Sequence, residues 1–527
     1  MGRVLTRRTA ALGLGLGALS AVGLAGCGPG KSGGTEGNPM APPTPAGPPR
    51  RGGRIRVAST TSSQADTLDP VKGAVSTDYA RHNLLYSGLT ELDAHLQPKL
   101  ALAEAIETDD RTLWRIRLRS GVEFHDGSSL TAQDVVYSLL RHKDAGIGSK
   151  AKGVADQIAA ASAVGPRELQ VRLVDANADL PAILATSHFL IVKDGTTDFR
   201  TANGCGPFRL KAFTPGVRTV ASRNPNYWKE GRPYLDEVEL IGIPDEVSRV
   251  NALLSGDVQF VNALDARSIH RVRATGAHEI LETRSGVYTN LILRQDSVPT
   301  GDPDFVLAMK HLLDRELIRK AVFRGFAEIG NDQPLPPWHP YYFPDLPQRI
   351  YDPDRARFLL KRAGLLNVRL AVFASATATG SVDIASILQE SAAKLGLRLL
   401  VNRAPADGYW STHWMKHPAT FGNTNPRPTA DLMFSLFFKS DAAWNESGWQ
   451  NPQFDQLLLA ARGEADEARR KQMYGDLQTM VHDASGIGIP VFISLVDAYD
   501  SRLKGVFPIP IGGLMGYAFG DHVWWDG

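Results

Sequence analysis

Residues 204–228 read GCGPFRLKAFTPGVRTVASRNPNYW and contain the signals of a β-hairpin. Phe208, Leu210 and Ala212 alternate with Arg and Lys, which is the period-2 pattern of a strand with one buried face. The Thr-Pro-Gly sequence at 214–216 predicts a turn, because Pro fixes φ and Gly can adopt positive φ. The two glycines at the start permit backbone angles that other residues resist. The stretch therefore predicts two antiparallel strands joined by a tight turn.

The composition is that of a large globular protein. The chain has 527 residues, which is too long for one ordinary core and suggests two or three domains. The formal net charge is +2 and no long block of Lys and Arg occurs, which argues against a nucleic-acid-binding function. Cys27 and Cys205 are the only cysteines, so at most one disulfide is possible. We expect Cys205 to be a small buried residue rather than a nucleophile.

The first 27 residues have the features of an export signal. Three arginines precede an apolar run at 10–26, which is marginal in length for spanning a membrane and is not followed by a stop-transfer charge cluster. Arg7 and Arg8 resemble the core of a twin-arginine signal, and a simple Sec signal is the alternative. The run ends in LAGC at 24–27, which resembles a lipobox. We therefore expect Cys27 to be acylated and to anchor the protein to a membrane.

A linker is predicted to follow the export signal. Residues 28–53 are mostly Gly, Pro, Ser and Thr, which cannot bury enough apolar surface to order themselves. Folded sequence is expected to begin near Arg54 with a short alternating strand.

A second distinctive stretch, residues 119–140, reads RSGVEFHDGSSLTAQDVVYSLL. Its Asp-Gly pair predicts a turn, and Thr131 followed by Asp134 predicts a helix that opens with a capping box. His125 and Asp126 have the chemistry of an acid–base pair. Because they lie in a predicted turn, we interpret their role as structural rather than catalytic.

Both stretches resemble signatures of the family 5 extracellular solute-binding proteins, the peptide and nickel receptors of ABC importers. The first contains the family's G-x-G-P-F, P-G and R-N-P-x-Y-W elements, and LDP at 68–70 with LLYSGLTEL at 84–92 resembles the family's opening. The resemblance covers nearly the whole mature chain. It implies an α/β fold of the two-lobed periplasmic-binding-protein class (type II, large cluster C form), with two crossover strands near residues 290 and 495. The implied organisation is lobe 1 at 54–290 with an inserted subdomain at about 80–200, lobe 2 at 291–495 and a return to lobe 1 at 496–527.

The second half of the chain has the rhythm of an α/β protein. A long helix is predicted from Asp304 to Phe323, and Asp352 followed by Pro353 predicts another helix start. Strands at 368–373 and 397–401 flank a predicted helix at 382–395, so we expect these two strands to be parallel. The last long helix is expected at about 465–483.

The sequence contains no common catalytic motif. G-x-S-x-G, the G-x-x-x-x-G-K-[ST] phosphate loop and H-E-x-x-H are all absent. Carboxylate pairs suited to glycoside hydrolysis stay possible, because 56 acidic residues always offer pairs. His413 and His417 would share one helical face, but a general-base Glu and a third ligand are not evident and Pro418 would end the helix. We therefore predict no catalytic residue, no metal site and no cofactor.

Residues 409–449 are the most informative for ligand binding. They combine several aromatic side chains with a few polar ones, the composition of a cleft that desolvates and orients a small ligand. In the family that this sequence resembles, dipeptide and oligopeptide receptors carry an Asp that pairs with the ligand's α-amino group. The resemblance implies that this Asp belongs to the segment matching 423–431. Here that segment reads NTNPRPTAD, and Asp431 lines up better with a structural position. Arg427 is present instead, and its fork could hold a carboxylate or a phosphate.

Seven residues are predicted to bind ligand. Tyr86 is included because the resemblance places its segment beside the cleft, and the others come from the aromatic and polar region. The candidates are Tyr86, Trp410, Asn423, Asn425, Arg427, Trp444 and Trp449.

The resemblance implies a monomeric, lipid-anchored solute-binding protein on the extracytoplasmic face of the cytoplasmic membrane. It would capture a small ligand between its lobes and deliver it to the permease subunits of an ABC importer. Peptides are the first expectation, followed by modified amino acids or opine-like compounds, sugar-containing compounds and metal chelates. Two other classes stay open: an extracytoplasmic hydrolase, and a structural or signalling lipoprotein that uses the receptor fold without transport.

Overall fold

The computed structural model describes residues 47–61 and 63–526. The expected export signal at 1–27, its Cys27, and the linker up to residue 46 lie outside these described residues. Gly52 donates its backbone N–H to the carbonyl of Tyr234 at 2.9 Å, and Gly53 donates to the Asp236 carboxylate at 3.0 Å. These bonds hold the chain where it enters the first strand. Within the described ranges, no helix has both the length and the apolar character needed to cross a membrane.

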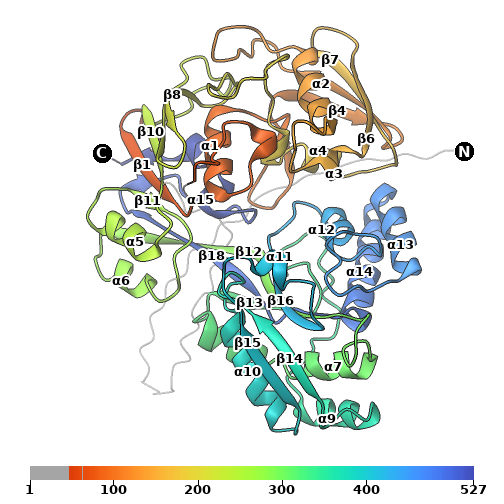
Figure 1. Ribbon diagram of the computed structural model, residues 1–527. Coiled ribbons are helices and arrows are strands. Elements are labelled where there is room, and N and C mark those ends of the chain that lie inside the picture. The colour runs from red at the N-terminus through yellow and green to blue at the C-terminus, as the bar shows by residue number, and fades with distance from the viewer. Residues whose placement is uncertain (1–46, 62, 527) are drawn as a thin grey trace, which may run out of the picture. The chain divides into compact units, whose positions relative to one another are not determined.

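A mixed sheet of twelve strands forms the centre of the fold (Figure 1). Its strand order is β15-β14-β16-β12-β18-β11-β1-β10-β9-β8, and β13 and β17 pair with β18 and β12. The strands are β1 Arg54–Ser59, β8 Phe208–Thr214, β9 Arg218–Arg223, β10 Glu237–Gly242, β11 Phe260–Val261, β12 His278–Leu293, β13 Ala327–Ile329, β14 Arg369–Ala374, β15 Arg398–Arg403, β16 Ala419–Thr424, β17 Ile487–Gly488 and β18 Val491–Asp500.

The two longest strands, β12 and β18, are the crossovers between the lobes. They pair antiparallel from His278 opposite Asp500 to Tyr288 opposite Phe492, with an irregularity between Thr283 and Val287. The first half of β12 alternates between buried and less buried residues, and its second half is buried at every residue. That change is expected where a strand passes from an open face into a sheet covered on both sides. The two predicted crossings, near residues 290 and 495, are confirmed.

A separate antiparallel sheet lies between the first strand and the hairpin in the sequence. Its order is β4-β5-β7-β6, with β4 at Ala103–Thr108, β5 at Leu113–Leu118, β6 at Ile158–Ala163 and β7 at Glu168–Leu173. Helix α2, Ala132–Leu140, packs against this sheet through Val135 and Leu139, which are buried in the same apolar cluster as Ile116. The shorter strands are β2 Thr90–Leu92, β3 Pro98–Leu100, β19 Leu503–Lys504 and β20 Trp524–Trp525.

The remaining helices cover the sheets and shape the loops between strands. They are α1 Ser76–Leu85, α3 Lys152–Ala155, α4 Leu180–Ile183, α5 Glu246–Leu254, α6 Ile269–Arg273, α7 Pro303–His311, α8 Arg315–Leu317, α9 Pro353–Arg362, α10 Ser381–Ala393, α11 Tyr409–Thr412, α12 Ala430–Phe437, α13 Pro452–Gly463, α14 Glu467–Ala484, α15 Gly513–Gly516 and α16 Phe519–His522.

The hairpin predicted from residues 204–228 is confirmed as β8 and β9. They pair from Phe208 opposite Arg223 to Thr214 opposite Arg218, and Gly216 in the turn has φ of 71°. The two leading glycines have a different role from the one expected, because neither adopts positive φ. A Cβ on Gly206 would lie 2.3 Å from the carbonyl carbon of Leu85. Glycine is needed there because the end of α1 passes directly over the backbone.

The second distinctive stretch folds as predicted and contacts the first. Asp134 accepts hydrogen bonds from the Thr131 backbone N–H at 2.7 Å and from its hydroxyl at 2.6 Å, completing the capping box. His125 Nε2 lies 3.1 Å from the carbonyl oxygen of Gly206. Burial lowers the pKa of His125 to about 4, so the ring is neutral near pH 7 and donates to that carbonyl. The two stretches therefore secure each other, which supports a structural role for His125.

The long helix predicted from Asp304 to Phe323 is wrong. Helix α7 ends at His311, Asp314 caps a new turn by accepting the Leu317 N–H at 2.9 Å, and residues 318–322 form a π-helical turn. The apolar residues on both sides of this break are buried in one cluster, so the helical spacing of apolar residues in the sequence continues across the break.

The βαβ prediction is confirmed, because β14 and β15 are parallel around α10.

Candidate ligand-binding site

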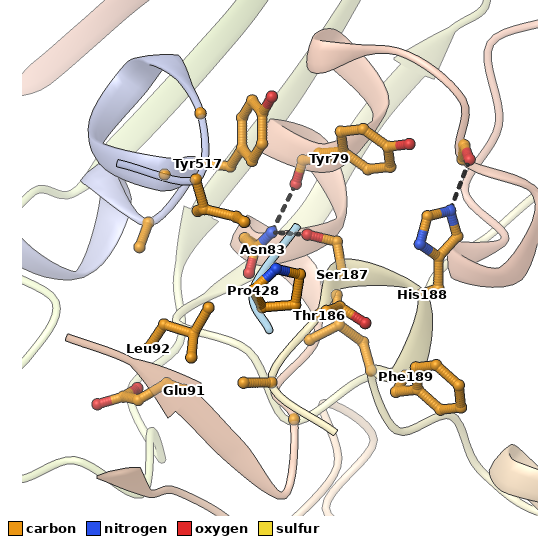
Figure 2. Close-up of a pocket in the computed structure, with 18 of the residues that line it drawn as sticks. Tyr79, Asn83, Glu91, Leu92, Thr186, Ser187, His188, Phe189, Pro428 and Tyr517 are labelled. Atoms are coloured by element: carbon orange, nitrogen blue, oxygen red, sulfur yellow. Dashed lines mark hydrogen bonds between the residues drawn. The ribbon is translucent and has the colours of Figure 1, made fainter. Parts of the chain in front are cut away.

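A cavity of about 640 Å³ is formed by segments far apart in the sequence (Figure 2). Its wall includes α1, the loop at 186–189, the loop at 425–428 and the segment at 512–517. The volume falls in the range of small-molecule sites, roughly 300–1,000 Å³. The wall thus combines two segments that precede β12 with two that follow β16.

One part of the wall is already held in place by hydrogen bonds. Asn83 donates from its amide to the carbonyl of Tyr79 at 2.8 Å and to the Ser187 hydroxyl at 2.9 Å. His188 Nε2 lies 3.0 Å from the carbonyl of Gly73, so it carries the proton and leaves Nδ1 as an acceptor. The Tyr79 ring packs against those of His188 and Tyr517, at centroid distances of 5.4 and 5.3 Å. Side chains fixed in this way lose little entropy when a ligand binds.

Arg427 is the distinctive charge of the cavity. It forms no salt bridge with any residue that the structure describes, and the hydrogen bonds of its guanidinium go to backbone carbonyls. Nη1 donates to the carbonyls of Asn425 at 3.1 Å and Pro426 at 3.2 Å, and the guanidinium lies over the Phe437 ring at 5.4 Å. Burial lowers the pKa of Arg427, but a guanidinium stays charged near pH 7. Arg427 is partly buried, and a partly buried cation without a counterion is ready to accept an anion.

Four of the seven predicted ligand-binding residues contribute to this wall, namely Tyr86, Asn425, Arg427 and Trp444. Trp444 is 44% exposed, whereas Tyr86 is nearly buried and donates its hydroxyl to the carbonyl of Leu68 at 3.0 Å. The ligand contacts of these residues stay a prediction.

The other three predicted residues lie outside the cavity wall. Trp410 is 40% exposed beside Tyr409 and Trp414, and Trp449 is buried against Phe454. Asn423 donates to the Thr289 hydroxyl on β12 at 3.1 Å. Ligand contacts of these three likewise stay a prediction.

Several wall residues were missed by the sequence analysis, notably Tyr79, Asn83, His188 and Tyr517. They come from α1, from a loop before the hairpin and from the C-terminal segment, and no local pattern connects these places. One signal was available, since GGLMGY at 512–517 is rich in glycine near a chain end. Glycine at such density indicates unusual backbone angles or a close approach.

His413 and His417 are close in space, but not for the reason considered. Helix α11 ends at Thr412, so the two rings do not share a helical face. The following loop brings His413 Nδ1 to 3.1 Å from His417 Nε2, and the His417 ring stacks on Phe373 at 3.8 Å. Within residues 47–61 and 63–526, no group of three or more His, Cys, Asp or Glu is arranged to hold a metal ion.

Cys205 is buried and unpaired, and burial raises the pKa of its thiol.

A buried carboxyl supports the loop that carries Trp444. Glu446 accepts from the indole N–H of Trp414 at 2.7 Å and from the amide of Asn290, on crossover strand β12, at 2.6 Å. It forms no salt bridge with a described residue, and burial raises its pKa to about 7. The folded protein therefore binds this proton more tightly than the unfolded chain does, and the stability it contributes at low pH is lost as the pH rises through about 7.

Replacement of Glu446 by Gln is expected to remove part of this pH dependence. The amide keeps the acceptor for Trp414 and can donate to Asn290 Oδ1, which is buried and without a partner. Relative to the wild type, the free energy of unfolding should be about 3 kcal/mol higher at about pH 8 and similar at about pH 5. Urea unfolding at the two pH values measures this, with the exposed Glu390→Gln as the control. Identical pH profiles for Glu446→Gln and the wild type would contradict the assignment.

Comparison with known proteins identifies clear relatives. The family described as "Bacterial extracellular solute-binding proteins, family 5 Middle" matches residues 96–446. The glutathione-binding protein GsiB of Escherichia coli K12 is 24% identical over 486 residues, covering 87% of this chain and 93% of that protein.

Two solved structures are similar throughout. The periplasmic binding protein DppA of Helicobacter pylori, in complex with the peptide STSA, has a TM-score of 0.77 at 21% identity, covering 91% of this chain and 99% of the other. AgaA of A. tumefaciens R10, in complex with agropinic acid, has a TM-score of 0.75 at 20% identity, covering 90% and 99%.

Proposed function

Because the chain belongs to the family 5 bacterial extracellular solute-binding proteins, which serve ABC importers, we propose that its cavity captures a small solute through an anionic group. The observation that carries this proposal is Arg427. Its guanidinium faces the cavity with two backbone carbonyls as its hydrogen-bond partners, and a carboxylate or phosphate would supply the missing charge.

A peptide is the first candidate, through its terminal carboxylate. Opine-like compounds or modified amino acids come next, followed by sugar-containing acids and metal chelates with carboxylate ligands. The names of the relatives support a solute with a carboxyl group, since glutathione, the peptide STSA and agropinic acid all contain one. The volume of about 640 Å³ suits molecules of this size.

Binding would act by closing the lobes around the solute. A molecule seated between Arg427 and the Tyr79–His188 wall contacts both lobes only when they are close together, so it prefers the closed state. A preference of about 5.5 kcal/mol moves such an equilibrium from roughly 1:99 to 99:1. The closed form would then be recognised by permease subunits of the importer.

The remaining parts of the chain fit the same proposal. Residues 1–27 would direct export, acylated Cys27 would hold the protein on the extracytoplasmic face of the membrane, and the Gly/Pro-rich linker would separate the body from the lipid. We propose lobe limits at 54–290, 291–495 and 496–527, with the protein acting as a monomer.

Identification of the bound solute tests the proposal. Native mass spectrometry of gently purified full-length protein gives the mass of any complex, and denaturation releases the ligand for fragmentation. The expected ligand carries a carboxylate or a phosphate. Protein that emerges empty would be titrated with pooled peptides, opines and organic acids. A strictly neutral or cationic ligand, or no retention from any pool, would contradict the proposal.

A further inference from the structure

The cavity wall also contains a buried acid that the sequence analysis did not single out. Asp497, on crossover strand β18, forms no salt bridge among the described residues and is almost completely buried. Its carboxylate accepts the backbone N–H of Ala263 at 3.2 Å and that of Leu514 at 2.6 Å. The nearby cation Arg249 donates instead to the carbonyls of Ile243, Pro244, Asn262 and Ala263.

A second acceptor lies beside Asp497. Asn262 is 2% exposed and contributes to the same cavity wall, and its Oδ1 has no hydrogen-bond partner in the described structure. Gly513 lies beside both side chains and lines the same cavity. A Cβ at this position would lie 3.1 Å from Asp497 Oδ1 and 3.4 Å from the Asn262 side chain. Glycine therefore leaves room beside this pair, where a donor group could approach.

The backbone around this pair is strained. Ala263, Leu514, Met515 and Tyr517 have φ of 55°, 52°, 59° and 73°, in the left-handed region that residues with a Cβ avoid at roughly 1–2 kcal/mol each. Asp497 accepts the N–H groups of two of them, Ala263 and Leu514. Strain of this kind persists where the surrounding structure enforces it, and it clusters at ligand sites. Here it fixes the part of the cavity wall around Asp497 and Asn262, which we call the acidic corner.

Two tyrosines connect this acidic corner to Arg427. The rings of Tyr79 and Tyr517 are 5.3 Å apart. Burial raises the pKa of Tyr79 to about 12, and the positive charge of Arg427 partly opposes this rise. Burial also raises the pKa of Tyr517, and the negative charge of Asp497 adds to that rise. One cavity wall thus includes a cation, an acid and an aromatic pair.

We propose that the solute is dipolar, with an ammonium group held by Asp497 and Asn262 and a carboxylate held by Arg427. The inference rests on the proposed function and specifies the solute class as zwitterionic amino-acid derivatives, free peptides included. The carboxylate of the solute would pair with the partly buried Arg427. Burial raises the pKa of Asp497 to about 7, and an ammonium group beside it would favour its ionised form. The amino group would be anchored from β18 rather than from the segment at 423–431.

Three pools of probes separate this inference from the proposed function. The first contains free amino acids, dipeptides and tripeptides, the second the same compounds N-acetylated, and the third the same compounds as C-terminal amides. Full-length protein is incubated with each pool, and retained compounds are identified by native mass spectrometry.

Only members of the first pool should be retained. Equal retention of N-acetylated compounds would overturn the ammonium site and leave Arg427 intact. Equal retention of amides would overturn the proposed anion site itself. Retention of nothing from the first pool would overturn the assignment of a zwitterionic solute.

Substitutions then assign the ammonium site to residues. For the tightest retained compound, Asp497→Asn should weaken binding by about 30-fold or more, since it leaves the solute's ammonium without its charge partner. Asp500→Asn, on the same strand and paired with Arg502, should have no effect. Because Asp497 also holds backbone, Asn262→Leu is a second probe with no charge change, and it should weaken binding about 5-fold or more. Unchanged affinity in both Asp497→Asn and Asn262→Leu, with thermal unfolding confirming the fold, would overturn the inference.

Discussion

Replacement of Arg427 by Met is expected to weaken solute binding by about 100-fold or more while leaving the empty protein at least as stable as the wild type. The two effects have one cause. The guanidinium lies in the cavity wall with no carboxylate partner in the described structure, so it is unfavourable when the cavity is empty and becomes favourable when an anion is bound. Isothermal titration with the identified solute gives the affinity, and urea unfolding gives the stability.

Two further variants show whether charge or geometry is responsible. Arg427→Lys keeps the positive charge but loses the planar fork, so an intermediate loss of affinity is expected. Arg403→Met removes an exposed cation that forms no salt bridge with a described residue, and it should change neither quantity. Full affinity in Arg427→Met would show that the anion of the solute binds elsewhere.

Replacement of Asp332 by Asn is expected to lower the free energy of unfolding by about 3–5 kcal/mol. Asp332 is completely buried and accepts from Arg315 at 2.7 Å, from Arg349 at 2.8 Å and from the N–H of Ile489 at 2.9 Å. Lys310 lies nearby, and burial lowers its pKa to about 7. Without the carboxylate, these buried cations lose the charge that compensates them.

Replacing Asp332 by Asn removes the negative charge and leaves the backbone conformation unchanged. Asp332 has φ of 53°, which Asn also tolerates, so the substitution adds little strain. Burial opposes ionisation of Asp332, but Arg315 and Arg349 overcome it and lower its pKa to about 2. The stabilisation is therefore complete above the ordinary pKa of Asp, about 3.9, and is lost as the pH falls towards 2.

Urea unfolding at neutral pH measures the Asp332 effect. The exposed pair of Asp198 and Arg200 provides the control, and Asp198→Asn should cause no measurable change. If Asp332→Asn were as stable as the wild type, the cations around it would have to be neutral or solvated, contrary to the geometry.

Local structure followed from the sequence wherever the signal was itself local. The hairpin at 208–223 and the capping box at Thr131 depend on residues close together in the sequence, and the parallel strands around α10 form one continuous βαβ unit. The helix predicted from Asp304 to Phe323 failed because an apolar stripe reports which face is buried, and two helical segments on one core produce the same stripe as a single helix. Capping by Asp314 was the competing local signal.

The sequence by itself determined the fold family through its resemblance, which also implied the two crossover strands. It further showed that Arg427 lies in the segment where the resemblance implies an acid in peptide receptors. Only the tertiary structure decided which residues share the cavity. Tyr79 lies 348 positions before Arg427, Tyr517 lies 90 positions after it, and no periodicity links the three residues. The structure also decided that Arg427 has no carboxylate partner among the described residues, and that Asp497 is buried beside the orphaned amide oxygen of Asn262. The sequence shows which residues carry a charge. Whether that charge is buried or paired depends on which distant segments pack together, and the tertiary structure alone decides this.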